Sequence, residues 1–172
     1  YGKNPYYLPA VGLDLSLINP TNDIRSAADA SDVIILVTPA AYLKAALERV
    51  EKADLEGVEM FGSNLSGVNL SGANLAGARL IRALLWDTVL EGASLKGANL
   101  KRAILEGANL KGACLDEASL KNVNLQQADL RGASLVNADL SDSLLNGALY
   151  DDKTVWPAGF DPKSFPLIFT PR

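Results

Sequence analysis

Leucine returns at every fifth position over 95 residues of this chain, from Ala53 to Gly147. The series starts at Leu55, contains methionine once, at Met60, and runs without a break to Leu145. The position two before each leucine carries a small residue, most often alanine, and the position two after it is often glycine. The chain is therefore built from nineteen units of five residues, followed by the start of a twentieth.

A period of five fits neither of the two standard elements of secondary structure. On an α-helix, where each residue advances by about 100°, five residues turn by about 500°, so the leucines would spiral around the axis instead of forming one stripe. In a flat strand, residues five apart point to opposite faces, so half of the leucines would face water. The chain must therefore turn a corner within each unit and wind as a coil around one axis, with the leucines inside.

Two further series predict how many units complete one turn of this coil. Glycine recurs at intervals of twenty, at Gly72, Gly92, Gly112 and Gly132. The positions ten residues further along carry other residues, namely Arg82, Arg102, Asn122 and Asp142. An outward position that is usually polar becomes aliphatic at multiples of twenty, at Leu84, Ile104 and Leu144. Both series fit four units per turn.

The pattern over residues 53–150 resembles the pentapeptide-repeat family, whose units read as a small residue, Asp or Asn, Leu or Phe, and two variable residues. Units close to this consensus are Ala-Asn-Leu at 73–75, 98–100 and 108–110, and Ala-Asp-Leu at 53–55, 128–130 and 138–140. The resemblance implies an all-β solenoid, namely a right-handed quadrilateral β-helix with four short sides per turn and about five coils in this chain. Most members of the family have no known activity, so the resemblance implies a fold more than a function.

Residues 1–52 precede the repeats and divide into two predicted parts. Residues 1–30 contain three prolines and only short apolar clusters, so they are expected to form an extended arm with Tyr6 and Tyr7 as docking residues. In residues 31–52, a β-branched run suits a strand, and a Thr-Pro pair then begins an amphipathic helix that ends directly before the repeats. A solenoid end exposes unpaired strand edges, so this helix is expected to cap the first coil.

Residues 151–172 are expected to close the other end. They begin like the segment that follows the repeats in many cyanobacterial members of the family, where aromatic residues cover the last coil; Trp156 and Phe160 are the candidates here. The last ten residues are expected to form a second extended arm with Phe165 and Phe169 as docking residues. This arm is too apolar to prefer water, because burial of apolar surface is worth about 25 cal/mol per Å².

Composition limits the classes of protein that remain. The 172 residues suffice for one domain with its ends, and no run approaches the ~20 apolar residues that a membrane span needs. The net charge is -4, from 20 acidic and 16 basic residues, which excludes a generally basic nucleic-acid-binding protein. The chain does not begin with methionine, so a processed N-terminus or an upstream segment is expected. A soluble protein of the cytoplasm, or one associated with the thylakoid or its lumen, fits these features.

The residues that carry out most enzyme chemistry are missing or isolated. There is no histidine, which excludes histidine-based triads and histidine metal sites. The single cysteine, Cys114, has no histidine partner and is interpreted as an inert surface thiol. Paired carboxylates such as Asp116 and Glu117 lack the patterned oxygen ligands of a calcium loop. No catalytic residue, metal site or cofactor is therefore expected, and the chain is predicted not to be an enzyme.

The four-sided winding sorts the outward side chains by side. Numbered in chain order, side one is centred on Leu55, side two on Met60, side three on Leu65 and side four on Leu70, and each recurs every twenty residues. Side two carries five basic residues in its middle coils against three acidic ones; the basic residues are Arg79, Arg82, Lys101, Arg102 and Lys121. This basic side is a candidate binding surface.

Side three departs most from the polar surface that is usual for the family. Its outward positions and neighbouring corners hold six apolar residues: Ile81, Leu84, Trp86, Val89, Ile104 and Leu144. An outward tryptophan with aliphatic neighbours and arginine alongside matches the composition of interface cores. Two interpretations remain open: an arm of the same chain covers this patch, or a separate protein binds it.

Two functions from different classes follow. The first is a non-catalytic interaction or scaffold module, a subunit or assembly factor of a larger complex, with a photosynthetic membrane as the setting by analogy. It would bind one or more proteins, but no nucleic acid, and would not span the membrane. The alternative is a DNA mimic that binds a type II topoisomerase, as some members of the family do. Mimicry needs a continuous acidic face, whereas residues 53–150 hold eight basic and eleven acidic residues, a net charge of only -3.

Overall fold

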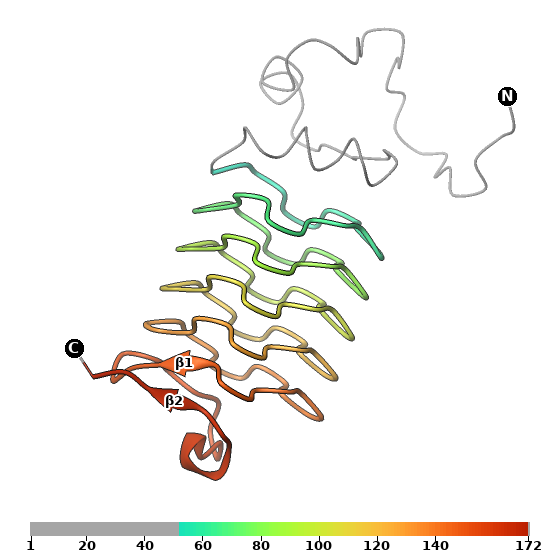
Figure 1. Cartoon of the computed structure of the whole chain (residues 1–172). Helices are drawn as coiled ribbons and strands as arrows, with labels where there is room; N and C mark the ends of the chain where they lie inside the picture. Colours follow the sequence, from blue (N-terminus) through green and yellow to red (C-terminus); the bar gives the residue numbers. More distant parts are fainter. Residues whose placement is uncertain (1–51, 172) are drawn as a thin grey trace, which may run out of the picture.

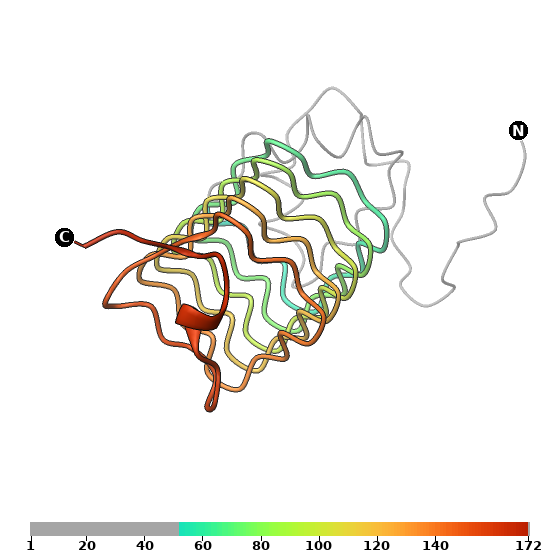
Figure 2. The same ribbon diagram turned by 60° about the horizontal axis from the view of Figure 1, so that its bottom comes forward.

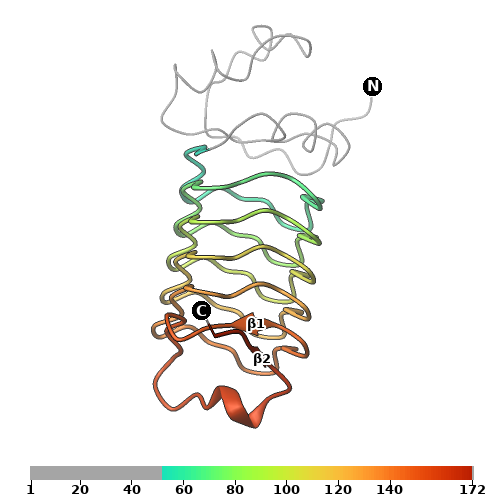
Figure 3. The same ribbon diagram turned by 60° about the vertical axis from the view of Figure 1, so that its left-hand side comes forward.

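The computed structural model of the chain describes residues 52–171 (Figure 1). From Lys52 to Tyr150 the backbone winds as a coil of regular turns stacked along one axis, which Figures 2 and 3 show from two further directions. The turns are parallel to one another and nearly equal in size, so the molecule has the shape of a rod with distinct side walls.

The part of the chain that precedes Lys52 lies outside the described residues. It includes the predicted arm of residues 1–30, with its docking candidates Tyr6 and Tyr7. It also includes all but the last residue of the segment 31–52, for which a strand and a capping helix are predicted. These expectations stay predictions.

Each turn of the coil takes twenty residues. Isolated parallel bridges join residues twenty apart in four ladders, one for each side, which begin at Asp54, Glu59, Asn64 and Asn69. Backbone hydrogen bonds run along the ladders; for example, the Leu75 N–H donates to the Ser94 carbonyl at 2.7 Å. The turn of four units, inferred from the glycine and aliphatic series, is confirmed.

Every unit changes direction through one tight turn. In the unit centred on Leu75, the Ala78 N–H donates to the Leu75 carbonyl at 3.1 Å, and Gly77 between them has a φ of 65°. A positive φ confined to the third residue of a turn is typical of type II turns. Glycine adopts this conformation without steric cost, which explains why most units carry glycine there.

The leucines form one dry column along the axis, as predicted. From Leu65 to Leu135 every leucine of the series is at most 1% exposed, and the small residue two before each of them is buried beside it in nearly every unit. Full burial of a leucine is worth about 1.5–3 kcal/mol, so this column is the main source of stability. Thr88 takes the place of alanine in one unit, and its hydroxyl donates to the Leu65 carbonyl at 2.9 Å. The buried hydroxyl is thereby satisfied.

Two short strands and one 3-10 helix complete the C-terminal end: β1 (Leu149–Tyr150), η2 (Pro162–Ser164) and β2 (Ile168–Phe169). Strand β2 pairs in parallel with β1, which places Ile168 opposite Leu149 and extends the ladder of side four. Val155 bridges to Ser134 and extends the ladder of side one in the same way. The segment after the repeats therefore continues two of the four walls.

Aromatic side chains pack in a row across this end. Ring centroids are 5.8 Å apart between Tyr150 and Trp156, 4.7 Å between Trp156 and Phe160, and 4.8 Å between Phe160 and Phe165. Trp156 and Phe160 pack against the leucine core, and Phe169 lies 5.3 Å from Tyr150. The tail, expected to form a second extended arm too apolar to prefer water, lies along the last coil through β2. Phe165 and Phe169 belong to the aromatic row but are still 40% and 49% exposed.

Candidate partner-binding surface

The repeat fixes where each outward side chain lies. The residue before each leucine and the two residues after it point away from the core, and the ladders align equivalent residues of successive turns. Neighbouring turns are about 4.8 Å apart, the ordinary spacing of paired strands. The surface therefore consists of straight columns of side chains, and a column of one charge or character forms wherever the same kind of residue recurs at an interval of twenty.

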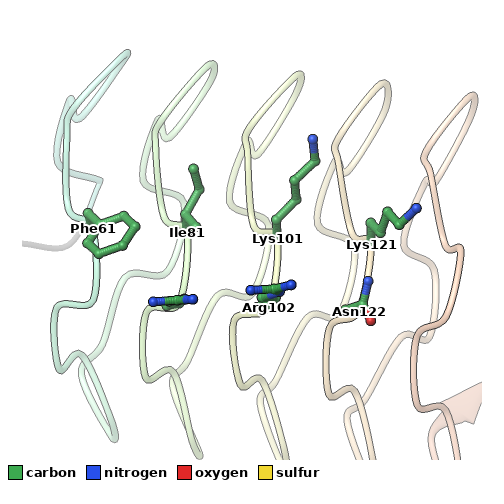
Figure 4. A pocket seen from close by; sticks show the side chains of 7 residues that line it. Phe61, Ile81, Lys101, Arg102, Lys121 and Asn122 are labelled. Atoms are coloured by element: carbon green, nitrogen blue, oxygen red, sulfur yellow. The ribbon is translucent and has the colours of Figure 1, made fainter.

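Two such columns meet at the corner that follows side two. Figure 4 shows Phe61, Ile81, Lys101 and Lys121 in one line on successive turns, with Arg102 beside that line. An open depression of about 580 Å³ lies along these columns, lined by Phe61, Ile81, Arg82, Lys101, Arg102, Lys121 and Asn122. Four of the five predicted basic residues thus come together; the fifth, Arg79, lies in the neighbouring ladder. We call this depression the basic corner.

Most cations on the coil have an acidic partner. Arg79 contacts Glu59 at 2.7 Å and Lys96 contacts Glu117 at 3.5 Å. At the basic corner the only ion pair among the described residues is a long one, 3.9 Å between Lys121 and Asp142. Within residues 52–171, the side chains of Arg82, Lys101 and Arg102 have neither an ion pair nor a hydrogen bond. Three exposed positive charges therefore lie together without an ion pair, and of these Lys101 is attracted by the Asp139 carboxylate.

The backbone of this corner is strained as well. Arg82 and Arg102 each have a φ of 60°, in the left-handed region where glycine is at ease. A side chain other than glycine costs about 1–2 kcal/mol in this conformation, and asparagine or aspartate costs less than arginine. The opposite corner, after side four, adopts the same conformation with glycine in its four regular turns: Gly72, Gly92, Gly112 and Gly132. Arginine is therefore present at the basic corner despite a conformational cost.

The predicted apolar patch is divided by the structure. Leu84 and Ile104 bridge directly to each other on side three, and Trp86, two residues after Leu84, is 46% exposed. Leu144 belongs to the same ladder, but Asn124 lies between it and Ile104. The three residues Leu84, Trp86 and Ile104, which we call the apolar cluster, follow Arg82 and Arg102 along the chain and border the basic corner.

The two remaining members of that patch lie elsewhere. Ile81 lines the basic corner, and Val89 belongs to the ladder of side four, where it bridges to Asn69 and Asn109. The described residues of the C-terminal tail do not cover the cluster, since β2 pairs on side four. Phe165 and Phe169 belong to the aromatic row at the end of the coil.

Sequence reasoning missed Phe61. This phenylalanine is 65% exposed and begins the column that continues with Ile81 and Lys101. A signal was present, because Phe61 precedes Ile81 by one full turn of twenty residues and gives that column two apolar members in succession. The basic corner consequently has an apolar end and a positively charged end.

Two carboxylates of the described coil have lowered pKa values. The pKa of Asp129 is lowered: burial raises it, but hydrogen bonds from Arg131 and contact with Lys111 outweigh that effect. Ser141 lowers the pKa of Asp139 by donating hydrogen bonds to its carboxylate. Both groups are therefore charged at neutral pH. Among residues 52–171 no three potential metal ligands gather, and no helix there is long and apolar enough to cross a membrane.

Two acidic residues and the single cysteine have neighbours on adjacent turns of the coil. Asp116 accepts hydrogen bonds from the Ser134 hydroxyl and the Val136 N–H, and Asp151 accepts one from the Gly132 N–H at 2.8 Å. Cys114 is half-buried in the ladder of side one, between two serines. The hydrogen bonds of Asp116 and Asp151 join residues of neighbouring turns.

Comparison with protein families finds a match to the model described as pentapeptide repeats. It occurs in eight copies, over residues 50–75, 73–112, 87–122 and 113–149, which together span more than half of the chain. Among curated proteins, none matches this chain.

Three solved structures of pentapeptide repeat proteins are similar to this one. The protein from the Arabidopsis thaliana thylakoid lumen has 30% sequence identity and a TM-score of 0.57, with 63% of this chain and 72% of that chain covered. A protein from the cyanobacterium Cyanothece 51142 has 38% identity and a TM-score of 0.36, with coverages of 63% and 67%. A protein from Nostoc Pcc 7120 has 27% identity and a TM-score of 0.41, with coverages of 81% and 99%.

Proposed function

Because the chain belongs to the pentapeptide-repeat family, a family of β-helical proteins that are generally structural or interaction proteins, we propose that it is a non-catalytic scaffold within a larger protein assembly. In this proposal residues 53–150 form a rod of about five coils, roughly 24 Å long at the usual strand spacing. Residues 1–30 and 31–52 supply an arm and a cap before it, and residues 151–172 close it. The walls of the rod bind the partner.

The observation that supports the proposal most directly is that two unusual surfaces, the apolar cluster and the basic corner, border each other. The apolar cluster exposes Trp86 beside Leu84 and Ile104, and the basic corner places two uncompensated arginines next to it. Aromatic residues and arginine are the residue types enriched where protein interfaces are most strongly bound. Elsewhere in residues 53–150, each basic residue has an acidic partner: Arg79, Lys96, Lys111 and Arg131.

A photosynthetic membrane is the setting that we propose for this assembly. The relative with the highest structural similarity among those given above comes from the thylakoid lumen of a plant, and two others come from cyanobacteria. The proposed partner is a protein of that compartment. A DNA mimic for a topoisomerase is less well supported, because a mimic needs a continuous acidic face and the basic corner interrupts it.

The proposal is tested by removing the apolar cluster. The double variant Trp86→Ala/Ile104→Ser should lose capture of partner proteins from native extract, because it removes the exposed ring and one aliphatic neighbour. Captured chains are identified by mass spectrometry, and circular dichroism checks that the coil is intact. The control is Val136→Ser, which removes a residue that is 40% exposed on side one and should capture the same chains as the unmodified protein. Undiminished capture by the double variant would show that the apolar cluster is not the interface, and failure of the unmodified protein to capture any chain would contradict the proposed function.

A further inference from the structure

We propose that the basic corner binds a short, extended acidic segment of the partner, whose carboxylates lie on Arg82, Lys101 and Arg102 and whose apolar end lies on Phe61 and Ile81. This inference rests on the proposed scaffold function and specifies the chemistry of the partner.

The charge arrangement favours an anion from outside the coil. Arg82 and Arg102 occupy equivalent positions on successive turns, about 4.8 Å apart at the backbone, and Lys101 lies beside them. Like charges at this spacing repel one another. Within the described chain Glu59 pairs with Arg79, Asp142 faces Lys121, and Asp139 attracts Lys101 and Lys121, but neither arginine has an ion pair. A partner that brings carboxylates would turn the repulsion between the arginines into attraction.

Arginine suits carboxylates in particular. The guanidinium group is planar and offers paired N–H donors, so it binds both oxygens of one carboxylate at once. Asparagine would hold the left-handed backbone at lower cost, as Asn122 does one turn further along with a φ of 59°. Other long side chains also adopt this conformation, at Lys52, Glu117 and Gln127. The recurrence of arginine in two successive turns of one column is therefore the feature that favours a role for the guanidinium group. Residues held in a strained backbone conformation are frequent at ligand-binding positions.

The length of the corner selects a short segment. From Phe61 to Lys121 the column takes three steps between turns, about 14 Å, which an extended peptide spans with four to five residues. Acidic residues bound the corner at both ends, with Glu59 at one and Asp139 and Asp142 at the other. A nucleic acid strand that continued past the corner would meet these acids and be repelled. A short acidic peptide avoids them.

The polarity of the corner sets the order of residues in that segment. Phe61 and Ile81 occupy the end nearer the start of the coil, and the cations follow towards the C-terminal end. We therefore expect an apolar residue at one end of the peptide and two or three Asp or Glu residues at the other. Both features together distinguish this peptide from a general polyanion.

The test measures binding of a fluorescein-labelled peptide, Phe-Gly-Asp-Glu-Asp, to the full chain by fluorescence anisotropy. We expect saturable binding that weakens with salt, because screening acts on exposed ion pairs. Arg82→Gly/Arg102→Gly should weaken binding at least tenfold, although glycine suits the backbone at both positions. A peptide with Asn and Gln in place of the acids should bind at least tenfold more weakly, and hexathymidylate should bind more weakly than the acidic peptide.

A matched variant separates position from charge. Adding Gly92→Arg/Gly112→Arg to the arginine-to-glycine pair moves both cations to the opposite corner with the composition, net charge and turn spacing unchanged. Peptide binding should stay as weak as in the double variant. If this variant does not fold, Arg82→Asn/Arg102→Asn supplies the comparison, since asparagine tolerates positive φ.

Three results would overturn the inference: no binding of the acidic peptide, equal binding by the variant with relocated arginines, or tighter binding of hexathymidylate. The scaffold function is judged separately by capture with Trp86→Ala/Ile104→Ser. Loss of capture in that variant, together with no peptide binding, would leave the scaffold function standing and remove only the acidic segment.

Discussion

The corner after side two and the corner after side four have the same backbone and opposite surfaces. Both turn through a residue with a φ near 60°. After side four this residue is Lys52 at the first turn and glycine from Gly72 to Gly132, where φ lies between 61° and 66° and only backbone is exposed. After side two it is Gly62 at the first turn and then Arg82, Arg102, Asn122 and Asp142. The fold specifies the conformation of the turn, and the cost of departing from glycine shows where a surface side chain is required for another reason.

The two corners also end differently. At the last regular turn after side four, the Gly132 N–H finds no carbonyl of a following turn, and the Asp151 carboxylate accepts its hydrogen bond instead at 2.8 Å. The chain itself therefore supplies the missing acceptor. At the basic corner the N–H groups of Arg82, Arg102 and Asn122 donate to carbonyls of the following turn, at 2.9 to 3.1 Å. The charged side chains of Arg82 and Arg102 are left without an ion pair within residues 52–171, which is why binding by a partner is expected there.

The largest effect should come from the core, on which both corners depend equally. Leu100 lies on side two and Leu110 on side four, and neither is exposed. Leu100→Ala and Leu110→Ala should each lower the free energy of unfolding by about 2–5 kcal/mol, because each leaves a cavity in the column. Chemical denaturation measures both. A cost for Leu100 far below that for Leu110 would show that the two sides are not supported by the same core.

A smaller loss should follow when arginine is placed at the glycine corner. Gly92 and Gly112 have φ values of 65° and 61°, and nothing lies within 4 Å of an added Cβ atom, so only the backbone conformation opposes a side chain there. Gly92→Arg/Gly112→Arg should cost about 2–4 kcal/mol in total. Arg82→Gly/Arg102→Gly should leave stability unchanged or raise it by up to about 1 kcal/mol, since glycine relieves the strain but gains freedom in the unfolded chain. A large loss in the latter variant would mean that the arginines support the fold.

Removal of Asp151 should destabilise the end of the glycine corner and the segment that follows Tyr150, and leave the basic corner intact. Asp151→Ala removes the acceptor of the part-buried Gly132 N–H and of the Lys153 N–H, and loss of an acceptor for a buried donor costs about 1–3 kcal/mol. Asp151→Asn keeps an oxygen acceptor and should cost less. Hydrogen exchange of the Gly132 amide should accelerate in the alanine variant, while binding of the acidic peptide at the basic corner should be unchanged.

The smallest effect concerns pH. The pKa of Asp129 in the folded chain lies below its ordinary value of 3.8, because hydrogen bonds from Arg131 and Lys111 outweigh the effect of burial. Its contribution to stability is therefore complete above that ordinary value and is lost as the pH falls through the lower folded value. Thermal unfolding between pH 5 and about pH 2 should show this loss in the unmodified chain and less of it in Asp129→Asn. An equal slope in both would show that other carboxylates account for it.

Periodicity explains what the sequence could predict. Each leucine repeats one environment, so a single argument about residues five apart predicted the dry column. Because Gly72 and Gly92 are twenty apart, they also predicted the number of units in a turn. Sorting by side then brought Arg82, Lys101 and Arg102 together correctly, since a repeat transfers the position of one residue to its equivalents.

The sequence did not predict the structure of the segment after the repeats, or the parts of the surface that depend on residues of the neighbouring turn. Val155 pairs with Ser134 and Ile168 with Leu149, at spacings of 21 and 19 residues, so the cap does not follow the spacing of twenty. Its packing depends on how aromatic rings fit together, which no period encodes. The apolar patch was divided because Asn124 separates Leu144 from Ile104, an effect of the neighbouring turn that a list of apolar positions hides.

Bridges pair residues that lie one full turn apart, so an insertion changes which residues face the same side of the rod. Insertion of one five-residue unit would rotate all later walls by a quarter turn, about 90°, and would carry Lys121 away from Lys101 without altering either residue. Insertion of four units would lengthen the rod and keep every wall in line. New faces can therefore arise by duplication alone, in steps of a quarter revolution, before any side chain is replaced.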